Sequence, residues 1–96
     1  MKKFVFLYVG FEPLTQESMQ TWGAWIGSIG DKMVDSGNPF SGGIEISHSG
    51  THELPLDKNA LTGYSIINAR DIEEAETLAS GCPMITSVRV YEAVAM

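Results

Sequence analysis

Leu61-Thr-Gly-Tyr-Ser-Ile-Ile-Asn68 is a run of β-branched and aromatic residues, which is typical of a strand. Asp71-Ile-Glu-Glu-Ala-Glu-Thr-Leu-Ala-Ser80 follows it. Its N-cap aspartate, Glu74 three residues later and its amphipathic spacing predict a short helix. Gly81-Cys-Pro83 ends that helix, and Ser87-Val-Arg-Val-Tyr-Glu-Ala-Val94 alternates like a strand. This last third of the chain predicts half of a split β-α-β fold.

The first strand is predicted over Lys3 to Val9. Both of its faces are apolar, which is typical of a central strand covered on both sides. Val5, Leu7 and Val9 form one face, and Phe4, Phe6 and Tyr8 form the other. Helices of the same domain would cover one face, and a second subunit is the economical cover for the other.

A long helix is predicted from the N-cap Thr15 to about Ser36, with Gly37 as its stop. Its apolar stripe should lie on the sheet. Beside that stripe, Gly23, Gly27 and Gly30 recur at helical spacing. Because each interior glycine destabilises a helix by about 1 kcal/mol relative to alanine, either another backbone approaches closely there or tertiary packing holds a weak helix. The apolar stripe consists of Met19, Trp22, Ile26, Ile29 and Met33.

The middle of the chain completes the predicted order. Ile44 to His48 alternates like a second strand, Ser49 to Asn59 is a polar loop, and Gly63 to Asn68 is the third strand. The resulting βαββαβ order predicts an α+β, ferredoxin-like single domain over residues 1–96. Its antiparallel sheet would carry both helices on one face.

Composition excludes several classes of function. The 96 residues carry a formal net charge of −6, with six lysines and arginines, so nucleic acid is not an expected partner. The apolar N-terminal run is too short to span a membrane. It resembles the start of a signal peptide, but Glu12 and Pro13 follow it in place of a small-residue cleavage site, which favours a first strand. Cys82 is the only cysteine, which fits a reducing compartment. The sequence therefore predicts a cytoplasmic protein without a membrane partner.

The chain resembles the YCII-related, or DGPF-type, domain family over nearly its whole length. The resemblance is carried by Lys3-Phe-Val-Phe-Leu-Tyr8, Gly30-Asp-Lys-Met-Val-Asp-Ser-Gly37, Leu61-Thr-Gly-Tyr-Ser-Ile66, and Ala75 to Ala79 leading into Gly81-Cys-Pro83. It implies a ferredoxin-like subunit that pairs through its sheet into a dimeric α/β barrel, with a small cleft on each subunit.

The resemblance also implies a class of activity, because some family members resemble enzymes acting on small ring lactones. A His–Asp pair has been proposed as catalytic in the family. The histidine would lie on the first helix, which has none here, and Cys82 stands where the aspartate is expected before Pro83. No catalytic residue and no cofactor are therefore assigned.

Arg89 and Tyr91 lie on one face of the last predicted strand, opposite the valines. In a sheet-paired dimer this face would line a shared cavity with Phe6, Tyr8 and Tyr64. A cation there requires a partner. If the partner of Arg89 is a carboxylate of the protein, the role of Arg89 is structural. If the guanidinium opens into a cavity, an anionic ligand is the expected partner.

The remaining reactive side chains have weaker signals. His48 is a further candidate ligand contact, but His48, His52 and Glu53 lack the convergence that a metal site needs. Cys82 is either a buried structural residue or a nucleophile.

Three functions fit these patterns. The first is a small enzyme, or descendant of one, that acts on an anionic or lactone-type metabolite in a dimer cleft. The others are a non-catalytic dimeric module that binds a metabolite or a protein, and a purely structural homodimer. An open polar pocket would favour the first two, and a filled cavity the third.

Overall fold

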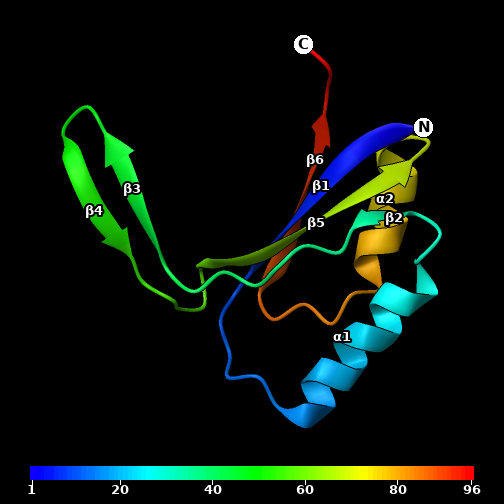
Figure 1. Ribbon diagram of the computed structural model, residues 1–96, viewed down its shortest axis with the longest axis horizontal. Coiled ribbons are helices and arrows are strands. Elements are labelled where there is room, and N and C mark those ends of the chain that lie inside the picture. The colour runs from blue at the N-terminus through cyan, green and yellow to red at the C-terminus, as the bar shows by residue number, and fades with distance from the viewer.

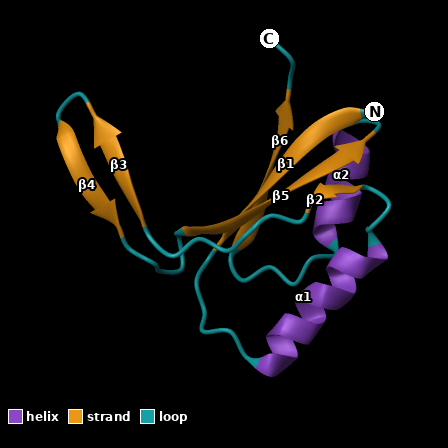
Figure 2. Ribbon diagram, in the orientation of Figure 1, coloured by secondary structure: helices purple, strands orange, loops and turns teal.

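The computed structural model describes residues 1–96 and has an α+β architecture. Its main sheet is antiparallel with the strand order β2-β5-β1-β6. Both helices cover one face of this sheet, and a two-stranded hairpin stands apart from it (Figures 1 and 2). Without the hairpin, the order is the ferredoxin-like βαββαβ predicted from the sequence. The elements are β1 (Lys2–Val9), α1 (Gln16–Ser28), β2 (Met33–Asp35), β3 (Gly43–Ser47), β4 (Gly50–Leu54), β5 (Leu61–Ala69), α2 (Ile72–Ser80) and β6 (Ser87–Ala93).

The core lies between the sheet and the two helices. β1 is central, between β5 and β6, as predicted. Its Phe4 and Phe6 are fully buried against Trp25 of α1 and Ala75 of α2. Val5 and Leu7 alternate with them and lie on the outer face of the sheet, where they are partly exposed. Neither helix has the length and apolarity needed to cross a membrane.

Both helices begin at the predicted caps. The Thr15 hydroxyl accepts from the backbone N–H of Ser18 at 3.0 Å, and the Ser18 hydroxyl accepts from the N–H of Thr15 at 2.9 Å. Asp71 accepts from the N–H of Glu74 at 2.9 Å. These bonds satisfy amide donors that a helix leaves free in its first turn.

The predicted end of the first helix is wrong. α1 stops at Ser28, and Met33–Asp35 forms the edge strand β2 beside β5. Ile29 is the C-cap, with φ −115°, a value outside the helical range. Gly37, with φ +79°, lies in the turn after β2 instead of ending the helix. Pairing with β5 supplies the backbone partners that the predicted last turns would have found within a helix.

The second predicted strand is also misplaced. Residues 44–47 belong to β3, which pairs only with β4 and not with the main sheet. Part of the loop predicted from Ser49 to Asn59 is therefore strand β4, although it is exposed as expected. The period-2 pattern identified a strand correctly, but the pattern does not specify which strand is its partner.

The glycine stripe is not a close-contact surface of the single chain. A Cβ built at Gly23 or Gly27 meets no atom within 4 Å. α1 is therefore held by its apolar side, and its glycines face open space.

Candidate functional site

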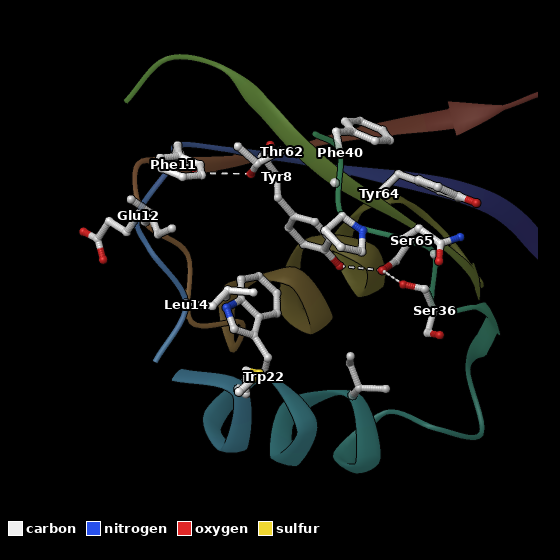
Figure 3. Close-up of a pocket in the computed structure, with 18 of the residues that line it drawn as sticks. Tyr8, Phe11, Glu12, Leu14, Trp22, Ser36, Phe40, Thr62, Tyr64 and Ser65 are labelled. Carbon is white, nitrogen blue, oxygen red and sulfur yellow. Dashed lines mark hydrogen bonds between the residues drawn. The ribbon is translucent and has the colours of Figure 1, made fainter. Parts of the chain in front are cut away.

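A pocket of about 490 Å³ opens between α1 and the end of the sheet that is nearest the helix N-terminus (Figure 3). Its walls are mainly apolar and come from β1, the segment between β1 and α1, and α1 itself. Because α1 lies across the sheet without sealing this end, the side chains there line a cavity instead of completing the core. The main apolar contributors are Phe11, Leu14, Met19, Trp22 and Ile26.

Aromatic rings build the inner wall. Tyr8 of β1 meets Trp22 edge-to-face, with ring centroids 4.9 Å apart and planes at 76°. Trp22 in turn meets Trp25 edge-to-face at 5.8 Å, which connects the wall to the core. Such contacts fix ring orientation beyond simple burial of area. Trp22 is therefore presented to the pocket by a rigid support.

A chain of hydrogen bonds forms the polar end of the pocket. The Tyr8 hydroxyl donates to the Ser65 hydroxyl at 2.7 Å, and Ser65 donates to the backbone carbonyl of Ser36 at 2.8 Å. Ser65 is 1% exposed, so its polar atoms need these partners. Burial raises the pKa of Tyr8 to about 12. Tyr8 is therefore a neutral phenol at physiological pH.

The segment after β2, residues 36–40, closes one side of the pocket. Gly37 lies so close to β5 that an added Cβ would be 1.7 Å from the Tyr64 carbonyl oxygen. Phe40 donates its backbone N–H to the Thr62 carbonyl at 2.8 Å, and its ring stacks on Tyr64 at 5.8 Å. Backbone contact thus fixes the pocket edge.

The pocket has little charge. No lysine, arginine or histidine lines it, and Glu12 is its one carboxylate. Thr62, another lining residue, donates its hydroxyl to the Gly10 carbonyl at 3.0 Å. The site can therefore enclose an apolar molecule and contact it with a few neutral polar atoms.

The structure separates the predicted site residues. Leu7 of β1 lies opposite Arg89 on one side and Tyr64 on the other. These residues therefore share the face away from the helices, as the alternation predicted, and Tyr91 follows on the same face. Phe6 and Tyr8 were expected on that face too, but they point toward the helices because they alternate with Val5 and Leu7. Tyr8 and Tyr64 both line the pocket, although they lie on opposite faces of the sheet.

Arg89 and His48 lie outside the pocket. Arg89 is exposed on the outer face and has no carboxylate within ion-pair distance in the single chain. An exposed guanidinium keeps its hydration, so it does not need the partner expected from its place in a strand. His48 is in the turn of the β3–β4 hairpin. His52, on β4, lies 3.6 Å from Glu45 across that hairpin.

Trp22, Ser65 and Ser36 are site residues that the sequence pattern did not identify as such. One signal was present: Ser65 stands between Gly63 and Ile67 on the buried face of β5. A serine on a buried face requires a hydrogen-bond partner. The bonds that Ser65 makes with Tyr8 and with the Ser36 carbonyl form the polar end of the pocket.

Cys82 is buried and unpaired. Burial is the main cause that raises the pKa of its thiol, which leaves it protonated at neutral pH. This environment is that of a structural cysteine and not of an activated nucleophile.

No protein-family model and no curated protein matches the chain.

Proposed function

We propose that this protein is a small-molecule-binding module whose ligand is uncharged, largely apolar and contains a ring. The supporting observation is the pocket of about 490 Å³, which has aromatic and aliphatic walls and a hydrogen-bonded polar end. Pockets of this size and chemistry are typical of small-molecule sites. The proposal corresponds to the non-catalytic alternative among the functions that the sequence suggests.

The charge distribution favours a neutral ligand over an anionic one. The chain carries a net charge of −6, and Glu12 is on the pocket lining. The cation that could have received an anion, Arg89, is on the outer face of the sheet. An anion in this pocket would have no opposite charge to compensate for its desolvation.

The test compares a filled pocket with an intact one. Gly23 lines the pocket and has space for a side chain, and Gly27 has similar space but does not line it. We expect neutral naphthalene derivatives to raise the melting temperature of the wild type and of Gly27→Leu but not of Gly23→Leu. Naphthoate, the anionic analogue, should have little effect. Equal responses of the two glycine variants, or none from the wild type, would refute the proposal.

An enzyme acting on a lactone-type metabolite is the second candidate. A lactone is uncharged and compatible with these walls, and Glu12 is a carboxylate that could act as a general base. The expected result is slow hydrolysis of an aromatic lactone that Glu12→Gln abolishes without loss of binding. Unchanged hydrolysis in Glu12→Gln would remove this candidate.

We also propose that two copies pair through the outer face of the sheet, in the cytoplasm. The accessible surface is 6581 Å², against about 5,400 Å² for a compact monomer of 10.4 kDa. The excess of about 1,200 Å² includes the projecting β3–β4 hairpin, all of whose strand residues are exposed, so the pairing proposal is supported by the apolar residues of the outer face. Partly exposed Val5, Leu7 and Ile66 provide the apolar part of that face.

A further inference from the structure

The hydrogen bonds at the polar end of the pocket have only one possible direction. The Ser36 carbonyl can only accept, so the Ser65 hydroxyl uses its one proton on that carbonyl. The Ser65 oxygen then accepts the proton of Tyr8. Figure 3 shows the two bonds, which connect the Tyr8 hydroxyl to Ser65 and Ser65 to Ser36.

This direction determines what Tyr8 can offer to a ligand. A phenol has one proton and can also accept. The proton of Tyr8 is committed to Ser65, so its oxygen retains acceptor capacity only. Turning the proton toward a ligand would break the bond to Ser65 and place two oxygen atoms 2.7 Å apart without a proton between them.

The protonation of Tyr8 keeps this arrangement constant. Tyr8 is a neutral phenol throughout the physiological range, since its ordinary pKa of 10.0 is already high and burial raises it further. Ser65 is almost completely buried and has no water to replace its partners. The donor sequence from Tyr8 to Ser65 to Ser36 is therefore a fixed feature of the site.

We propose that the pocket selects ligands that donate a hydrogen bond to the Tyr8 oxygen, such as phenols, aryl alcohols and N–H heterocycles, over analogues that can only accept. This inference rests on the proposed binding function and specifies its ligand class. A ring lies between the aromatic walls, and its O–H or N–H meets the Tyr8 oxygen. An ether, ketone or lactone oxygen in the same place would face an acceptor.

The experiment uses 2-naphthol and its methyl ether, 2-methoxynaphthalene, as a matched pair at neutral pH. They share a ring system, but only the naphthol can donate. Titration of the intact protein should give a dissociation constant for 2-naphthol roughly fivefold to tenfold lower than for the ether, which corresponds to one net hydrogen bond. Unsubstituted naphthalene reports the apolar contribution alone.

Two variants identify the atom responsible. Tyr8→Phe keeps the ring but removes the oxygen, so the preference for naphthol should fall to less than about twofold while naphthalene still binds. Ser65→Ala removes the acceptor for the Tyr8 proton, which frees that proton for the ligand. The ether should therefore gain affinity relative to naphthol in this variant.

The outcomes separate the two proposals. Equal binding of naphthol and ether by the wild type, or a preference unchanged in Tyr8→Phe, would overturn the proposed selection of hydrogen-bond donors. The proposed binding function would remain in place. If neither these probes nor naphthalene bound, both proposals would be overturned. If circular dichroism shows that Tyr8→Phe does not fold, the wild-type preference for naphthol and its change in Ser65→Ala test the proposal instead.

Discussion

The indole nitrogen of Trp25 donates a hydrogen bond to the backbone carbonyl of Leu78 at 3.0 Å. Leu78 is in the last turn of α2, where helix carbonyls lack partners within the helix. In a continued helix the Leu78 carbonyl would accept from the backbone N–H of Cys82, but that N–H bonds to the Ala79 carbonyl instead. One buried side chain of α1 therefore caps the C-terminal end of α2 and joins the two helices beneath the sheet.

Trp25→Phe should destabilise the protein by about 1–3 kcal/mol, since it leaves the Leu78 carbonyl without its donor but retains a ring. Urea unfolding followed by circular dichroism measures the change. Trp22→Phe is the control, because Trp22 lines the pocket instead of capping α2. An equal loss in both variants would mean that ring volume matters and the hydrogen bond does not.

Gly37 and Gly27 should respond to alanine in opposite directions. Gly37 has φ +79° and its Cβ would be 1.7 Å from the Tyr64 carbonyl oxygen, so Gly37→Ala should destabilise by about 3 kcal/mol or more. Gly27 is helical and open, so Gly27→Ala should stabilise by up to about 1 kcal/mol. Melting temperatures of both variants decide the matter. A stabilising Gly37→Ala would contradict the close contact with β5.

The strongest local patterns predicted the fold well. The alternation in β1, β5 and β6 and the capped pattern of α2 placed the central strands and the second helix. The spacing of Ile29, Met33 and Val34 suits a helix, but pairing with β5 makes 33–35 a strand. Local spacing cannot register that tertiary pairing, so the helix was predicted too long.

The site was less predictable because contacts between distant segments build it. Tyr8 and Tyr64 were candidate residues, but the bond from Tyr8 to Ser65 spans 57 positions in the sequence. The pocket exists because α1 ends early and the segment after β2 returns along β5. Local spacing registers neither feature, so the residues of this pocket were not predicted together. The cavity expected between two subunits on the outer face of the sheet stays a prediction.

Alkaline pH should destabilise the protein partly through Tyr8. The pKa of Tyr8 is about 12 in the folded protein, against 10.0 ordinarily. Between these values the unfolded chain releases the proton while the folded protein keeps it, so stability falls as pH rises from 10 to about 12. Tyr8→Phe should lessen this decline in urea unfolding curves.

That comparison needs a background without Cys82, because burial also raises the pKa of its thiol and acts in the same direction. Cys82→Ala alone and Cys82→Ala with Tyr8→Phe form the matched pair. Parallel stability curves for the two proteins from pH 10 to 12 would show that the folded protein does not hold the Tyr8 proton more tightly than the unfolded chain does.

Leu7→Glu should separate the proposed dimer without unfolding the subunit. Leu7 lies directly opposite Arg89 on the outer face of the sheet. A glutamate there can pair with Arg89 across the strands, and such pairs contribute roughly 0.2–1 kcal/mol, so subunit stability should change little. Two copies of that face would, however, have to bury the new charges, which is unfavourable.

Sedimentation equilibrium at micromolar concentration should show a dimer for the wild type and a monomer for Leu7→Glu. Ile72→Glu, at an exposed position in the first turn of α2, is the control and should remain dimeric. A monomeric wild type, or a dimer that survives Leu7→Glu, would show that the outer face is not where two copies meet.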